Sequence, residues 1–226
     1  MITSFLYFLA ILMIIVSLVL SSNVKKTFKE WSQHPTMRGW TGADLARQIL
    51  NYNGVYNVSV APTQGNLSDN YNHKEQTVYL SNEVYYGNSI AALAVAAHEC
   101  GHAVQYNEKY FPISFRTALF PVARLGSTAG FWIALIGILL SAIIPFSFII
   151  VDIGILLFAF AVMFHVVTLP VEFNASKRAM QVLQTNGVLT EQELPGAKKV
   201  LNAAAMTYVA AALSSVIQLF RFMNAR

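Results

Sequence analysis

The chain carries His98-Glu99-Cys100-Gly101-His102 inside an alanine-rich stretch, Ser89 to Gln105, that predicts a helix with Asn88 or Ser89 as its N-terminal cap. Residues four apart share one face of a helix, so His98 and His102 can point both imidazoles at one Zn²⁺ ion. Glu99 is then placed to act as a general base on a water at that ion. A chance match to this pattern is expected only about 0.004 times in such a chain, which favours a metal site.

The composition around this helix is that of a membrane protein. Of the 226 residues, 55% are hydrophobic and only 12% are charged, about half the proportion of roughly 25% in soluble proteins. The formal net charge is +4, and the basic residues form no stripe with aromatic residues, so nucleic acid is not an expected partner. The single cysteine, Cys100, excludes an intrachain disulfide, and we interpret it as a small buried residue of the helix rather than a ligand.

The N-terminal segment predicts a membrane span. Ile2 to Leu20 is uncharged and long enough to cross the bilayer as a helix, and no basic residue precedes it as in a cleaved signal peptide. Lys25, Lys26 and Lys29 follow at once. The positive-inside rule therefore places the N-terminus outside and the chain from residue 21 onward in the cytoplasm.

Four segments follow from these patterns. We expect a transmembrane helix over 1–20, a cytoplasmic domain over 21–124, a hairpin of two transmembrane helices over 125–169 and a helical segment over 170–226. The cytoplasmic domain should hold an amphipathic helix and two strands, at 41–51, 55–60 and 76–80. The apolar stretch 203–220 is either a fourth span or a buried or interfacial helix, and Arg221 and Arg226 favour the second interpretation.

A catalytic zinc needs a third protein ligand. Suitable donors downstream of His102 are five: Glu108, His165, Glu172, Glu191 and Glu193. Glu172 is the best of these, because the hairpin returns the chain to the side of His98 just before it. A helix-dipole charge is the alternative role for Glu172, and an outer-sphere role for His165 also stays open.

The chain resembles the membrane-bound neutral zinc metallopeptidases of bacteria that are similar to YugP. The resemblance spans nearly the whole chain, and its most specific segments are Leu80 to Gln105, with the histidine motif, and Leu169 to Ser176, with Glu172. It implies a mainly α membrane protein that combines transmembrane helices with a small α+β, zincin-like HExxH domain. It also supports Glu172 as the third zinc ligand, and implies a multi-pass protein of the bacterial cell membrane.

The chain departs from this family's pattern at polar positions. Asn174 stands where the family usually has Asp, and Asn70 and Asn72 stand in a stretch that usually reads Asp-His-Tyr-Asp. Ser176 stands where related glutamate-ligand enzymes often have Asp. Such carboxylates typically orient a ligand histidine, so the departures concern the partners of the ligands and not the ligands themselves.

The expected function is zinc-dependent hydrolysis of peptide bonds in protein or peptide substrates, with His98, His102 and Glu172 as ligands and Glu99 as the base. The Gln76 to Leu80 strand either pairs with an extended substrate or is an ordinary internal strand of the domain. Four residues are candidates to stabilise the oxyanion: Tyr71, Tyr208, His165 and Arg178.

Two other functions stay open. One is a catalytically idle, zinc-stabilised membrane scaffold that binds a partner protein, and an intact Glu99 argues against it. The other is metal transport, which the position of the histidines outside the predicted spans disfavours. The sequence also leaves open a homo-oligomer or a membrane partner protein.

Overall fold

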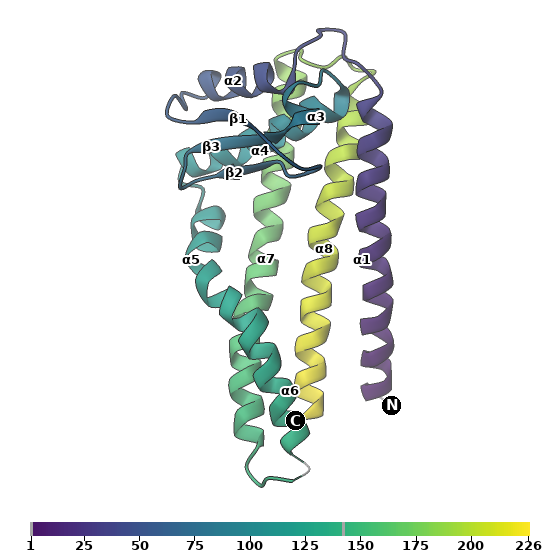
Figure 1. Cartoon of the computed structure of the whole chain (residues 1–226), viewed down its shortest axis with the longest axis vertical. Helices are drawn as coiled ribbons and strands as arrows, with labels where there is room; N and C mark the ends of the chain where they lie inside the picture. Colours follow the sequence, from purple (N-terminus) through teal and green to yellow (C-terminus); the bar gives the residue numbers. More distant parts are fainter. Residues whose placement is uncertain (1, 142) are drawn as a thin grey trace. The chain divides into compact units, whose positions relative to one another are not determined.

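The computed structural model describes residues 2–141 and 143–226. It is mostly helical, at 73%, with four long apolar helices and a small three-stranded sheet (Figure 1). The chain divides into two compact units. Unit 1 comprises Met1–Val19, Ser114–Pro170 and Thr207–Arg226, and unit 2 comprises Leu20–Ile113 and Val171–Met206.

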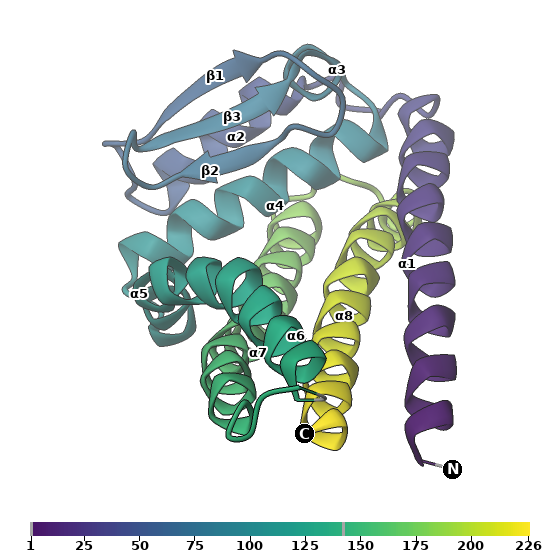
Figure 2. The ribbon, with the colours of Figure 1, turned by 60° about the horizontal axis from the view of Figure 1, so that its bottom comes forward.

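Unit 2 contains the sheet, whose strands follow the order β1–β3–β2 (Figure 2). The central strand β3 (Thr77–Ser81) is parallel to β1 (Ser59–Thr63) and antiparallel to β2 (Asn70–Asn72). Four of the five residues of β3 are buried, as expected for a strand paired on both sides. The expected strand at 76–80 is confirmed within one residue. Of its two interpretations, the internal strand holds and pairing with substrate does not, because β3 is paired on both sides.

Two helices of unit 2 begin at side-chain caps. Helix α2 (Gly42–Tyr52) begins after Thr41, which forms a capping box with Asp44, and helix α4 (Ile90–Asn107) begins after Ser89, whose hydroxyl accepts from the Ala92 amide. These caps confirm the expected starts of both helices. The two helices pack together in one apolar core with the sheet, which includes Leu45, Leu50, Val78, Leu80, Leu93, Leu183 and Val200.

The expected strand at 55–60 is wrong over most of its length. Tyr56 and Asn57 form a turn, with Tyr56 78% exposed, and β1 starts only at Ser59. Val55 is buried, but in the connection after α2 rather than in a strand. The apolar residues of this stretch are therefore explained by contact with the core. A turn can make such contact as well as a strand, so they do not indicate a strand.

Helix α7 (Phe148–Thr185) continues through Pro170, where the sequence predicted a break between the hairpin and a second helix. Proline removes one backbone donor and crowds the preceding turn, yet apolar helices tolerate it when their neighbours satisfy the freed groups. A 38-residue helix is about 57 Å long, so a hydrocarbon layer of about 30 Å would hold only part of it.

Unit 1 is built from apolar helices that approach closely at glycines. Helix α5 (Phe111–Leu125) continues through a π-helical turn, η1 (Gly126–Gly130), into α6 (Phe131–Leu140). A Cβ atom at Gly130 would lie 2.7 Å from the Phe158 amide nitrogen, and one at Gly137 would lie 2.8 Å from that of Val151. Gly126 and Gly130 are four apart, the spacing of small residues at close helix contacts in membranes, so α7 packs directly on this hairpin arm.

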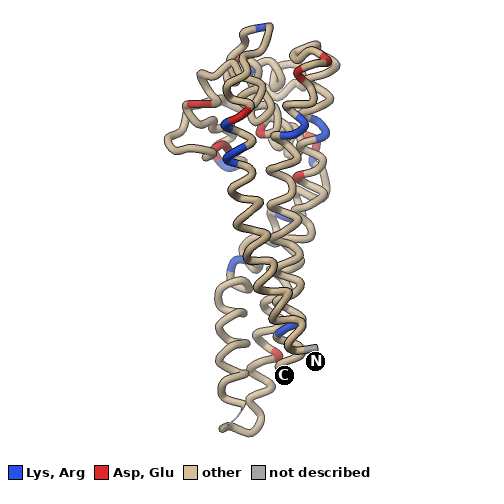
Figure 3. Tube along the Cα trace, turned by 90° about the vertical axis from the view of Figure 1, so that its right-hand side faces the viewer, with Lys and Arg blue, Asp and Glu red and all other residues tan. Residues whose placement is uncertain are grey.

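Within residues 2–141 and 143–226, four helical stretches are long and apolar enough to cross a membrane: Thr3–Ser32 in α1 (Ile2–Ser32), Phe111–Leu140, Phe148–Thr185 and Leu194–Ala225 in α8. The last includes 203–220, for which the sequence favoured a buried or interfacial helix; length and composition alone permit a crossing. Charged residues are sparse along the helices of unit 1 (Figure 3, blue and red on the backbone trace). They are Arg116, Arg124, Asp152, Arg221 and Arg226.

Candidate metal centre

Helix α4 presents two histidines on one face. His98 and His102 are four residues apart, and their ring centroids lie 4.8 Å apart at an interplanar angle of 84°. His102 is buried and the His98 side chain is 14% exposed. The small residues that surround them on this helix keep its backbone close to its neighbours, so both imidazoles are held in the interior of unit 2.

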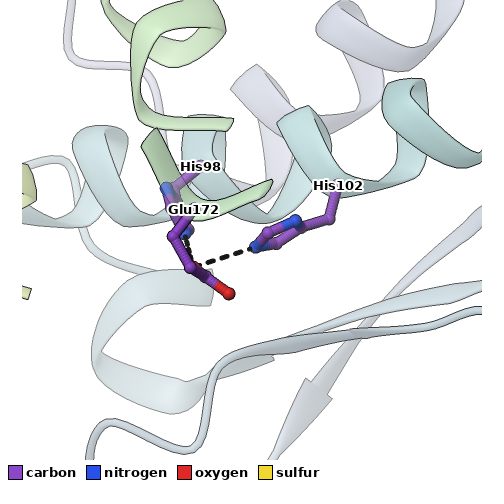
Figure 4. Close-up of side chains that lie close together, drawn as sticks. All are labelled: His98, His102 and Glu172. Carbon is purple, nitrogen blue, oxygen red and sulfur yellow. Dashed lines mark hydrogen bonds and ion pairs between the residues drawn. The ribbon is translucent and has the colours of Figure 1, made fainter. Parts of the chain in front are cut away.

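Glu172 of helix α7 meets both imidazoles (Figure 4). Its Oε2 atom lies 3.3 Å from Nε2 of His98 and 3.5 Å from Nε2 of His102, and the residue is 2% exposed. One ligand atom from each of the three residues lies within 4.8 Å of the other two. The structure thus brings together the three residues for which the sequence predicted a shared ion.

The donor set suits zinc. Two imidazole nitrogens and one carboxylate oxygen are a known ligand set of catalytic zinc sites. Bonds of about 2.0–2.2 Å at tetrahedral angles place neighbouring ligand atoms about 3.3–3.5 Å apart. The 3.3 Å and 3.5 Å separations between Glu172 and the two histidines match this spacing. The residues therefore fit a zinc ion, and three protein donors would leave a fourth position for water.

The electrostatics of the centre depend on burial. Burial raises the pKa of Glu99 above its usual range, and the neighbouring His98 and His102 oppose this rise. Burial would lower the pKa of His102, but the hydrogen bond and charge of Glu172 outweigh it and raise that pKa. A carboxyl group with a raised pKa is a better proton acceptor, which is the property a general base needs near neutral pH.

Each histidine has a neutral polar partner at its second ring nitrogen. Nδ1 of His102 lies 3.0 Å from Oε1 of Gln105, and Nδ1 of His98 lies 3.2 Å from Oγ of Ser176. The serine that departs from the related enzymes' aspartate therefore still contacts a histidine. Asn174, the other departure near Glu172, accepts hydrogen bonds through Oδ1 from Gln105 and from Arg178.

The other candidate ligands are not part of this group. Glu108 accepts a 2.6 Å bond from Arg178, and Glu193 accepts from the backbone amides of Thr190 and Met37. His165 lies in unit 1, beside a cavity of about 420 Å³. Among the described residues, only His98, His102 and Glu172 form a cluster that could hold a metal.

Cys100 faces away from the cluster. Its thiol donates to the Ala46 carbonyl of helix α2 at 3.6 Å, and burial raises its pKa, so the neutral thiol is the favoured form. Both observations agree with its interpretation as a small buried residue. Of the oxyanion candidates, Arg178 is engaged by Asn174 and Glu108, and Tyr71 contacts the Tyr106 ring; neither contact tests the role.

Sequence reasoning missed two polar residues of this region. Gln105 is completely buried three residues after His102, and Asp69 accepts from the amide and hydroxyl of Ser81 at the end of β3. The sequence held a signal for the first, since an amide side chain one helical turn after a ligand histidine can reach its ring. The local sequence held no signal for the contact of Asp69, because Ser81 is 12 residues away and is brought beside it by the pairing of the strands.

Comparison with known proteins agrees with this geometry. Residues 6–226 match the family described as "Putative neutral zinc metallopeptidase". The chain is 46% identical over 200 residues to the "Putative membrane protease YugP" of Bacillus subtilis (strain 168), which covers 88% of this chain and 87% of that protein. No solved structure matches the chain significantly. With nearly its whole length matched, this chain belongs to the family of putative neutral zinc metallopeptidases.

Proposed function

We propose that this protein is a zinc-dependent endopeptidase of the bacterial cell membrane, with its catalytic centre on the cytoplasmic side. One observation carries the proposal: His98, His102 and Glu172 converge within 4.8 Å, and Glu99 follows the first of them directly. The family and the name of the relative support peptide substrates and a membrane location. A purely structural metal site would not need Glu99.

In this proposal, the chain's own residues divide the work. His98, His102 and Glu172 would hold the ion, which when bound would polarise the scissile carbonyl and acidify the attacking water. Glu99 accepts a proton from that water while the water oxygen adds to the carbonyl carbon. Glu99 then delivers the proton to the amide nitrogen as the C–N bond breaks, which releases a carboxylic acid and an amine; the acid's proton then passes to the amine, giving a carboxylate and an ammonium group.

The test compares two identical substitutions. Glu99→Gln removes the base and should lower the turnover of a fluorogenic peptide library at least about 100-fold, while the purified protein keeps about one zinc per chain. Glu191→Gln, an exposed carboxylate that the sequence left as an alternative ligand, should leave turnover and zinc content unchanged. Full turnover by Glu99→Gln would refute the role of Glu99.

The third ligand is tested by zinc content. Glu172→Gln should lose most of the bound zinc in elemental analysis after gel filtration in detergent, and Glu191→Gln should retain it. A chelator should abolish turnover, and added zinc should restore it. A wild-type protein that holds zinc but cleaves no member of the library would instead favour the idle scaffold that binds a partner protein.

A further inference from the structure

Gln105 joins the two helices that carry the candidate ligands. Its side chain is completely buried on α4, one turn after His102. The amide nitrogen donates to the Val171 carbonyl at 2.8 Å and to Oδ1 of Asn174 at 2.9 Å, both on α7. These two acceptors flank Glu172 in the sequence. A single side chain therefore connects the neighbours of the carboxylate with the ring of a histidine.

These contacts determine which nitrogen of His102 carries a proton. A backbone carbonyl can only accept, so the Gln105 atom facing Val171 must be the amide nitrogen. The other amide atom, Oε1, then faces Nδ1 of His102 at 3.0 Å and can only accept. Nδ1 of His102 must therefore donate, so the lone pair of the neutral ring, the form that binds a metal, is on Nε2, the atom that faces Glu172.

A chain of polar contacts holds Gln105 in this orientation. Oδ1 of Asn174 also accepts from Nε of Arg178 at 2.8 Å, and Arg178 is held in turn by Glu108 at 2.6 Å. Asn174 uses only its oxygen in these contacts, so aspartate, the family's usual residue here, could make the same two. This series of contacts starts at His102 and Gln105 on α4, crosses to Asn174 and Arg178 on α7, and returns to Glu108 at the C-terminal end of α4.

We propose that Gln105 is a positioning residue, which fixes the tautomer of His102 and the placement of α7 beside Glu172 for zinc binding. The inference rests on the proposed zinc site and extends it to the partners of the ligands. Zinc-bound histidines are usually oriented by a carboxylate, a backbone carbonyl or water, and loss of such a partner weakens metal binding about 10–100-fold. Here a neutral amide orients the ring without adding negative charge.

The test replaces Gln105 by methionine, which is similar in length but offers His102 only a weakly accepting sulfur and has no N–H to donate to α7. The zinc Kd of Gln105→Met, measured with a competing chelator, should rise about 10–100-fold. The visible absorption of the cobalt-substituted variant should also differ from the wild type, because the ring of His102 loses its fixed orientation. Gln184→Met, at an exposed position of α7, is the matched control and should behave as the wild type.

Melting curves separate positioning from simple packing. A packing role would lower the melting temperature equally with and without zinc, whereas positioning reduces the increment that zinc adds. If Gln105→Met does not fold, Asn174→Ala decides, because it removes the acceptor beside Gln105 without changing α4. An unchanged zinc Kd and cobalt spectrum in the variant that folds would overturn the proposal.

These measurements also separate this inference from the proposed function. They use zinc and cobalt binding and not hydrolysis. A wild-type protein that binds metal but cleaves no peptide would contradict the endopeptidase, while the Gln105 comparison would still give a decisive result. A wild-type protein that binds no zinc would overturn both proposals together.

Discussion

Gly101 sets how closely helix α4 approaches helix α7. A Cβ atom at this position would lie 2.9 Å from the backbone oxygen of Ala175 and 3.2 Å from its Cα atom. Contacts this short with a backbone are not relieved by turning a side chain, so one helix would have to move. Ala175 lies three residues after Glu172. The absence of a side chain at Gly101 therefore lets α7 lie close enough to α4 for the Glu172 carboxylate to contact the histidines.

Gly101→Ala should destabilise the protein and weaken zinc binding. We expect the free energy of unfolding to fall by about 1–3 kcal/mol, the usual cost of adding a methyl group to a packed interior. The zinc content after gel filtration should fall, since α7 is displaced next to Glu172. Cys100→Ala is the control, because this neighbouring thiol contacts Ala46 instead, and it should retain its zinc. Full zinc retention by Gly101→Ala would show that the contact is not needed.

Single residues also show how far the sequence could lead. The pairing of His98 with His102 follows from helix periodicity alone, and the proximity of Glu172 followed from the expected hairpin. The role of Gln105 did not follow, because its partners Val171 and Asn174 belong to a helix 66 or more residues away. Local spacing predicts contacts within one helix, whereas contacts between helices need their packing.

At the scale of elements, an aromatic stack connects the turn after β2 with helix α4. The His73 ring lies parallel to the Tyr106 ring, with centroids 4.8 Å apart and an interplanar angle of 4°. Burial is the main cause that lowers the pKa of His73 from its ordinary value of 6.5, and Lys74 adds to it. Burial and the Lys74 charge therefore favour the neutral imidazole, so this junction between sheet and helix is sensitive to acid.

The sign of the pH effect follows from this lowered pKa. Between the folded pKa and 6.5, the unfolded chain binds the proton more readily than the folded chain. The contribution of neutral His73 is complete above pH 6.5 and is lost as the pH falls through the lower, folded pKa. His73→Phe keeps an aromatic ring but cannot titrate, so its melting temperature should fall less than that of the wild type between about pH 7.5 and 5.5. Equal falls would contradict the assignment.

The elements differ in how well the sequence predicted them. Ser89 was correctly predicted as a helix cap, because a cap is a local interaction, whereas Thr41 was placed in its helix and is instead the residue that caps it. Strand β2 was missed, since its asparagines are typical of turns and only pairing with β3 makes the segment extended. Pro170 suggested a helix end for a similar reason: its local preference is overridden by the surroundings of α7.

For the whole molecule, the orientation in the membrane stays a prediction. Lys25, Lys26 and Lys29 follow the first apolar segment, and the stretch between the two central spans, 145–147, carries no charge. The positive-inside rule then places the candidate centre in the cytoplasm and this stretch outside. The predicted boundaries between membrane spans and cytoplasmic segments, at residues 20, 124 and 169, depend on the same reasoning and likewise stay a prediction.

Cysteine labelling tests this orientation. In a Cys100→Ala background, Phe146→Cys should react with a membrane-impermeant maleimide in intact cells, since Phe146 is 72% exposed and predicted to lie outside. Lys74→Cys, at an exposed position in the turn after β2, should react only after the cells are permeabilised. The reverse pattern would place the candidate centre outside the cell and contradict the cytoplasmic location.

The order of the candidate ligands along the chain has a consequence for biosynthesis. Glu172 follows His98 by 74 residues, and both helical arms of the hairpin lie between them. A ribosome releases both imidazoles well before the carboxylate, so a growing chain cannot complete the proposed centre until the hairpin has been made. Under the proposed function, the nascent chain therefore has no peptidase activity towards other proteins at the translocon. It gains this activity only when the hairpin has entered the membrane.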